Sequence, residues 1–303
     1  RLRDHLASAG EATATAIEEA GEALGASVQY AGAEAVSLAE LVRTGVPDGP
    51  EAVRFHLALL RGVDLALAAA RYLPCERPLL ERAAPLLRAA ADEARRLGVQ
   101  VHPGPDRLPD VPAPCPVQTL PAFGATHGAL VWVDQHGFAM ADGRAEPAIV
   151  RVATEPAPAW FEALLEGYEA VMMAAPGSAE GAAQARAYRG WLDELPGVHD
   201  PERRCTTLRY AATAVFDAVQ PDRPTSAAAA FERLAQALEG AGSYVIPLDT
   251  DALSDARRYE LVLRPGVGAP RLVRPGFQGP GHVVQQRARV LADPGWLGTM
   301  SSR

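Results

Sequence analysis

Apolar and small residues recur every three or four positions from Ala14 to Val42. This heptad spacing is typical of a helix that packs against another helix as in a coiled coil. Two interpretations stay open, because such a stripe can be covered within the chain or by a partner. We expect the second, because the next helices are shorter and leave part of the stripe uncovered. Leu24 and Val28, at its centre, are then the self-association residues of a homodimer.

The same helical period recurs in both halves of the chain, and short β-branched runs close each half. In the first half it predicts helices over about 50–72 and from about 75 to 98, then strands at 129–133 and 148–153. In the second half it predicts helices at about 160–175, 179–195, 205–219 and 225–240, then strands at 244–248, 259–263 and 283–291.

A proline-rich stretch separates helices from strands in the first half. No helix or central strand tolerates the proline density of residues 98–121, so a connector is expected there. Helices first and strands last in each half predict an α+β fold that is mainly helical. We expect two domains, 1–156 and 157–303, each made of amphipathic helices followed by a small β unit.

One short segment occurs twice. Gly137-Phe138 is followed by a strand that contains Arg151, and Gly276-Phe277 by a strand that contains Arg289, at spacings that a single gap aligns. Each Gly-Phe pair is interpreted as a turn before a paired strand. The segment predicts an internal repeat, with two β units that superpose.

Composition narrows the classes of function. The chain has 303 residues, 48% of them hydrophobic, which is enough for one large or two medium cores. Its net charge of −8 argues against nucleic-acid binding, which needs a positive face. Every basic residue is arginine, as expected from a GC-rich bacterial genome. Without lysine, a P-loop phosphate site, a Schiff base and a Ser-Lys dyad are all excluded.

Cysteine usage and hydropathy indicate a compartment. Cys75, Cys115 and Cys205 are far apart, so they form neither a disulfide framework nor a paired-thiolate zinc site. No apolar run is long enough for a membrane span, and a signal peptide is not expected. We therefore expect a cytoplasmic protein, no membrane partner, and a chain that is a fragment of something longer because it begins without Met.

The acidic run Asp249, Asp251 and Asp255 has two interpretations. Clustered carboxylates suit a hard cation, but a helix N-cap at Thr250 or Asp251 explains the same pattern. The second is favoured, because the glycine and bidentate glutamate of a calcium loop are missing. We expect no metal and no cofactor.

His127, Asp134, His136 and Asp142 lie close together in the first β segment. They could form an acid-base pair, although isolated histidines near turns are more often surface or capping residues. No nucleophile elbow or zinc-binding helix accompanies them. No catalytic residue is assigned.

The segment from Gly137-Phe138 through Arg144 and Pro147-Ala148 to Arg151-Val152 resembles the closing segment of GrpE-type nucleotide-exchange factors, with a partial echo at 276–290. The order of long heptad helix, short helices and small β unit is similar to that family too. The resemblance implies a β unit that touches the nucleotide-binding domain of an Hsp70-type ATPase, and long helices that dimerise. The partner-binding residues are then Gly137, Phe138, Arg144, Arg151, Gly276, Phe277 and Arg289.

Two functions follow as hypotheses. The first is a non-enzymatic binding or adaptor protein that recognises a protein partner, in its most specific form a GrpE-like regulator of an Hsp70-type ATPase. The alternative is a bacterial enzyme of a tailoring or conflict-system pathway, with a site between the two halves.

Overall fold

The computed structural model describes residues 50–73, 76–103, 113–174, 179–218 and 225–294. The heptad segment with Leu24 and Val28 lies outside these ranges. The chain divides into two compact units, each of which is described by itself. The first comprises residues 1–157 with 175–186, and the second comprises 158–174 with 187–303.

The described residues form an α+β fold of 6 helices and 12 strands in four small sheets. About 49% is helical and 26% is strand, so the expectation of a mainly helical chain is wrong. The physical reason is strand length. Most strands have only two to five residues, too few to show an alternating pattern.

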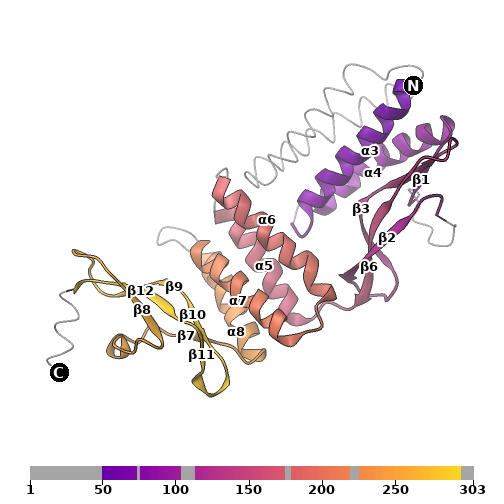
Figure 1. Cartoon of the computed structure of the whole chain (residues 1–303). Helices are drawn as coiled ribbons and strands as arrows, with labels where there is room; N and C mark the ends of the chain where they lie inside the picture. Colours follow the sequence, from indigo (N-terminus) through magenta and orange to yellow (C-terminus); the bar gives the residue numbers. More distant parts are fainter. Residues whose placement is uncertain (1–49, 74–75, 104–112, 175–178, 219–224, 295–303) are drawn as a thin grey trace. The chain divides into compact units, whose positions relative to one another are not determined.

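Two helices that lie side by side open the described part of the first unit (Figure 1). Helix α3 (Pro50–Ala70) begins at a proline, which suits the first helical position because no amide hydrogen bond is lost there. Helix α4 (Glu76–Arg96) ends before Gly98, whose φ of 82° is the left-handed conformation typical of a helix C-terminus. The chain passes directly from this glycine into the first strand.

Six strands follow in two three-stranded sheets, ordered β1-β4-β5 and β2-β6-β3. Strand β2 runs parallel to β6, and the other pairs are antiparallel. The strands are β1 (Val99–His102), β2 (Val117–Phe123), β3 (Leu130–Gln135), β4 (Gly137–Met140), β5 (Ala145–Glu146) and β6 (Ala148–Glu155).

The expected connector 98–121 therefore contains β1 and most of β2. Pro121 lies inside β2 without disrupting the sheet, because β2 is an edge strand that pairs only with β6. Edge strands tolerate proline because one side of the strand needs no hydrogen-bond donor.

In the second unit three helices pack against one another: α5 (Ala159–Ala174), α7 (Pro201–Ala218) and α8 (Thr225–Gly240). From α6 (Ala179–Glu194) Tyr188 adds its ring to this core, 5.8 Å from the ring of Tyr168. Helix α8 leads through Gly242, with φ 77°, into the second set of strands. These are β7 (Tyr244–Ile246), β8 (Tyr259–Leu263), β9 (Arg271–Arg274), β10 (Gly276–Gln278), β11 (Val284–Gln286) and β12 (Ala288–Ala292).

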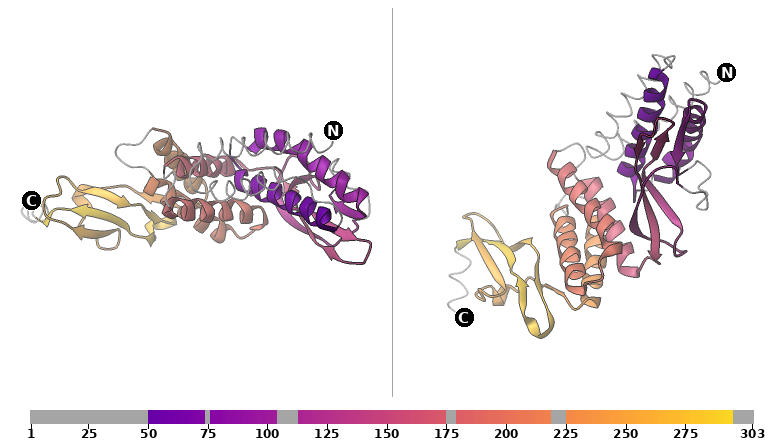
Figure 2. Two further views of the ribbon diagram at one scale, coloured as in Figure 1. Left: turned by 90° about the horizontal axis from the view of Figure 1, so that it is seen from above. Right: turned by 45° about the vertical axis from the view of Figure 1, so that its right-hand side comes forward.

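The two β units pair their strands in the same way. The second unit has the orders β7-β10-β11 and β8-β12-β9, again with one parallel pair, β8 and β12. Each unit also has a helix pair before its first strand, α3 with α4 and α7 with α8, as Figures 1 and 2 show. An internal repeat remains a prediction.

Gly137 and Gly276 were expected to lie in turns, but they are the first residues of strands β4 and β10. A Cβ atom on Gly137 would lie 2.4 Å from the backbone nitrogen of Ala148, and one on Gly276 would lie 2.3 Å from that of Ala288. Backbone atoms cannot move away cheaply, so only glycine fits. The glycines are required for close approach and not for a turn.

This contact also corrects the alignment of the two segments. Ala148 and Ala288 each donate a backbone hydrogen bond of 2.9 Å to the residue that precedes the parallel strand, so they mark the same position. Counting from them, Arg151 corresponds to Leu291, and Arg289 corresponds to Ile149. The two arginines are therefore two positions apart along equivalent strands.

The core of the first unit is formed by α3, α4, β1 and β4, with Leu59, Ala90 and Phe138 among its buried residues. His56 is fully buried beside Phe55, and neither of its ring nitrogens has a hydrogen-bond partner among the residues that the structure describes. Burial lowers the pKa of His56, a shift that the nearby Glu93 carboxylate partly opposes. The imidazole is thus kept neutral within an apolar core.

We expect Gly276→Ala to destabilise the protein by about 1–3 kcal/mol, the usual cost of overpacking, because the new methyl group meets backbone atoms. Urea unfolding of the variant and the wild type would measure the difference in the free energy of unfolding. Gly268→Ala is the matched control, since nothing lies within 4 Å of the place that its Cβ atom would take. Equal stability of the two variants would contradict the close approach.

Stability should fall as the pH is lowered from about 7 to about 5, in part because of His56. Its folded pKa lies below the unfolded value, so the unfolded chain binds the proton first and acid favours unfolding. His56→Leu should flatten this dependence in urea unfolding at each pH. His127→Gln, at an exposed histidine, should leave the dependence as in the wild type.

Candidate functional site

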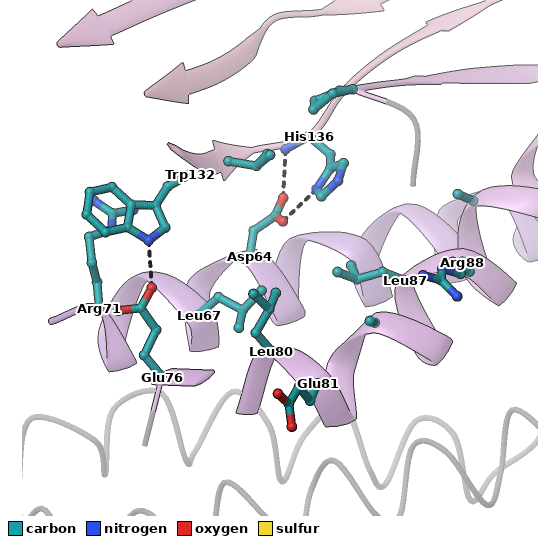
Figure 3. Close-up of a pocket in the computed structure, with 14 residues that line it drawn as sticks. Asp64, Leu67, Arg71, Glu76, Leu80, Glu81, Leu87, Arg88, Trp132 and His136 are labelled. Carbon is teal, nitrogen blue, oxygen red and sulfur yellow. Dashed lines mark hydrogen bonds and ion pairs between the residues drawn. The ribbon is translucent and has the colours of Figure 1, made fainter. Parts of the chain in front are cut away.

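A pocket of about 510 Å³ opens between α3, α4 and β3 of the first unit (Figure 3). This volume lies in the range of small-molecule sites. Its walls combine leucines and alanines with several charged side chains. The lining residues are Asp64, Leu67, Arg71, Glu76, Leu80, Glu81, Ala84, Leu87, Arg88, Ala91, Pro103, Trp132, Val133 and His136.

Asp64 and His136 form a hydrogen-bonded pair in this pocket. One Asp64 oxygen accepts from the His136 backbone N–H at 2.7 Å, and the other lies 2.6 Å from His136 Nδ1. Because an ionised carboxylate can only accept, Nδ1 carries the proton. The second ring nitrogen, Nε2, is then free to accept a hydrogen bond, or to donate one if protonated.

Glu76 occupies a second polar position, at the start of α4. Its carboxylate accepts from Trp132 Nε1 at 2.6 Å and from the Tyr72 backbone N–H at 2.9 Å. The rings of Tyr72 and Trp132 meet edge to face with centroids 5.2 Å apart. The indole is thus fixed at one wall of the pocket, between a carboxylate and an aromatic ring.

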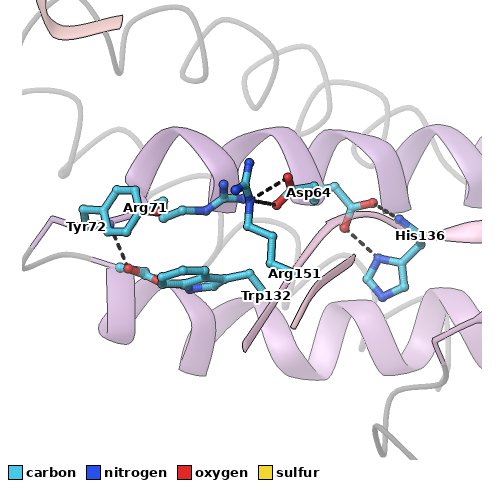
Figure 4. A network of polar contacts seen from close by, with 8 residues as sticks. Asp64, Arg71, Tyr72, Trp132, His136 and Arg151 are labelled. Carbon is cyan, nitrogen blue, oxygen red and sulfur yellow. Dashed lines mark hydrogen bonds and ion pairs between the residues drawn. The ribbon is translucent and has the colours of Figure 1, made fainter. Parts of the chain in front are cut away.

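Asp134 is shared by two buried arginines, Arg71 and Arg151, which are labelled in Figure 4. Arg151 Nε donates to Asp134 at 2.9 Å, and Arg71 forms a short ion pair with the same carboxylate. The Arg71 guanidinium also lies over the Trp132 ring, 5.3 Å from its centroid. This network connects α3, β3 and β6.

The second β unit lacks these polar residues at the same register positions. Strand β3 has a bulge beside β6 in the first unit, and strand β9 has one beside β12 in the second. Asp134 lies at the bulge of β3, and Val273 lies at the bulge of β9. Arg151 is replaced there by Leu291, and His136 by Pro275. The β framework therefore does not require the ionic network. Since buried ion pairs often stabilise no more than apolar residues of similar size, these side chains point to a role in the site.

His102 lies within the electrostatic field of His136, and Arg88 lines the same pocket as His136. Burial lowers the pKa of His102, and the positive field of His136 lowers it further. Arg88 is exposed where it lines the pocket, and it forms no hydrogen bond or ion pair with another described residue. Glu81 is paired with Arg77 at 3.2 Å.

The residues expected to bind a partner are placed in different environments. Phe138 and Phe277 are buried in the cores of their units, and Gly137 and Gly276 are covered by the central strands. Arg151 belongs to the buried network described above.

Two of the expected partner residues are accessible. The Arg144 side chain is 74% exposed and pairs with Asp142, and that of Arg289 is 45% exposed and pairs with Glu260. Both carboxyl groups have a lowered pKa. In Asp142 the backbone N–H of Arg144 is the main cause, and in Glu260 it is the hydrogen bond from Arg289.

His127, Asp134, His136 and Asp142, which were weighed as a possible acid-base pair, each contact other residues. His127 bonds the Thr154 carbonyl, and the other three contact Asp64 or arginines.

Sequence reasoning missed Asp64, Arg71 and Glu76. One signal was available: Asp64 interrupts the apolar run of α3 at a position next to its apolar face. An acid in such a place needs a buried partner.

The acidic run 249–255 is a capping structure. A short 3₁₀-helix (Thr250–Ala252) has Asp249 as its N-cap, which accepts from the Asp251 backbone N–H. The cap is thus one residue earlier than expected. Among the residues that the structure describes, no group of three or more His, Cys, Asp or Glu could hold a metal ion. No helix in the described ranges is long and apolar enough to cross a membrane.

Comparison with known proteins adds no relative: no protein-family model, curated protein or solved structure matches this chain.

We expect Asp134→Ala to cost about 3–5 kcal/mol, because it leaves the buried cations Arg71 and Arg151 without their shared carboxylate. The triple variant Arg71→Met, Asp134→Val, Arg151→Leu should cost less, since it removes all three charges together. Urea unfolding of both variants tests the point. A triple variant less stable than the single one would mean that the ions stabilise the fold.

Proposed function

We propose that this protein is a non-enzymatic binding protein, an adaptor that recognises a protein partner through its β units. In its most specific form it is a GrpE-like regulator of an Hsp70-type ATPase. The observation that supports the proposal is the recurring arrangement of a helix pair followed by six strands in two sheets. The resemblance to the GrpE family implies a long heptad helix, short helices and then a small β unit, and the heptad helix lies outside the described residues.

Among the described strands, β2 in the first unit and β8 in the second are edge strands of their sheets. Both edges carry exposed apolar side chains: Val117 on β2, and Val262 and Leu263 on β8. An unpaired edge offers backbone donors and acceptors to an added strand, and exposed side chains give such pairing its specificity. The edges are thus suited to binding an extended segment of a protein partner.

Arg144 and Arg289 are the exposed members of the expected partner-binding set. Arg144 lies in the turn between β4 and β5, and Arg289 lies on the central strand β12. Arginine is suited to this role because its planar guanidinium forms paired hydrogen bonds with carboxylates.

We expect the protein to accelerate nucleotide release from an Hsp70-type ATPase of the same organism, measured with a fluorescent nucleotide in a stopped-flow instrument. The double variant Arg144→Glu, Arg289→Glu should lower the acceleration about tenfold or more by reversing both charges. Arg54→Glu, an exposed arginine on α3, is the matched control. If the wild type neither binds such an ATPase nor accelerates nucleotide release, the chaperone form of the proposal is excluded.

A second candidate is an enzyme with an acid-base site in the first unit. The observation that favours it is the Asp64–His136 pair beside an apolar pocket, since an imidazole oriented by a carboxylate is a common general base. Hydrolysis of nitrophenyl esters of increasing chain length would test it. Activity that His136→Gln does not reduce would exclude this site as its source.

A further inference from the structure

Some of the charged and hydrogen-bonding groups that line the first unit's pocket have a partner within the described ranges, and others do not. Each carboxylate that lines it has a donor: Asp64 has His136, Glu76 has Trp132, and Glu81 has Arg77. The groups without such a partner within the described ranges are His136 Nε2 and the Arg88 guanidinium. Both are basic. The pocket is therefore complementary to an acidic group.

The rest of the wall is apolar. Leu67 on α3 and Leu80 and Leu87 on α4 face the cavity, and Ala84 and Ala91 leave space between the helices. In the view of Figure 3, His136 and Arg88 lie toward one end and Trp132 toward the other, with Leu67 and Leu80 between them. A ligand that fills this space needs an apolar body.

We propose that the pocket binds an amphipathic monocarboxylic acid, with its carboxyl group on His136 Nε2 and Arg88 and its apolar body along Leu67, Leu80 and Leu87. The imidazole suits either form of the ligand. Its neutral Nε2 accepts from a protonated carboxyl group, and the imidazolium donates to a carboxylate while Asp64 stabilises its charge. Arg88 supplies a cation in both cases.

A comparison with the second β unit indicates that the polar end of this pocket is particular to the first unit. Its residues at the positions of His136, Asp134 and Arg151 are Pro275, Val273 and Leu291, which cannot form the polar end of such a pocket. The equivalent position of the second unit is therefore not expected to bind this ligand. The site does not depend on the adaptor proposal, because Arg144 and Arg289 do not line it.

Isothermal titration calorimetry of the full chain with three ligands of equal chain length tests the proposal. The ligands are decanoate, decan-1-ol and decyltrimethylammonium, each below its micelle concentration. We expect decanoate to bind at least about tenfold more tightly than the other two. Equal or tighter binding of the alcohol or the cation would overturn the proposal, and so would the absence of decanoate binding.

Variants locate the site. His136→Gln and Arg88→Gln should each weaken decanoate binding about tenfold and leave the alcohol unaffected, while His127→Gln, outside the pocket, should change neither. Ala84→Trp should exclude all three ligands by filling the cavity. Arg88 is exposed, so its variant keeps the test decisive if His136→Gln fails to fold. Unchanged decanoate binding by Arg88→Gln and Ala84→Trp would show that the ligand lies elsewhere.

Discussion

The contact between a strand-opening glycine and the backbone of the central strand determines the architecture of both β units. Gly137 meets Ala148 in the first unit, and Gly276 meets Ala288 in the second. At this point the two sheets of a unit approach so closely that no Cβ atom fits between them. Protein interiors are dense enough that such a contact fixes the positions of neighbouring strands. The register of each sheet, and the direction of each side chain, follow from it.

On this common framework the two units differ mainly in polarity. A bulge re-aims the side chain that it contains, and it does so in both units, for Asp134 and for Val273. In the first unit the re-aimed carboxylate joins α3 to the sheet through Arg71 and Arg151. The second unit has Val273 and Leu291 at the positions of Asp134 and Arg151. The strand framework therefore does not require these two charges.

The helices can be predicted from sequence because their period is local. The expected helix at 225–240 coincides with α8. The expected helix at 179–195 starts at the same residue as α6 and extends one residue beyond its end. The strands are harder to predict, because pairs such as β2 with β6 depend on distant partners, and a proline inside β2 disguises it as a connector. Gly137 and Gly276 stand out in the sequence, but a glycine's sequence neighbours do not distinguish a turn from a close approach.

The candidate site shows the same limit. His136 and Asp134 attract notice by their proximity in sequence. Their partners Asp64, in helix α3, and Arg71, directly after this helix, lie more than sixty residues earlier. Arg151, which was expected to bind a partner, is buried and hydrogen-bonded to the carboxylate at the bulge. Side chains that meet only through tertiary structure leave no periodic signal. An acid within an apolar helical run is the available indication.

The parallel pairing of β2 with β6 has a consequence for the order of folding. Three other strands lie between them in the chain, so their pairing closes a long loop, whereas α3 with α4 and β3 with β6 involve shorter ones. Closing longer loops costs more entropy, and contacts distant in sequence form more slowly. We expect the helix pair to assemble early and the parallel pair late. Because the Asp134 network joins α3 to β6, the pocket wall would be completed only near the end of folding.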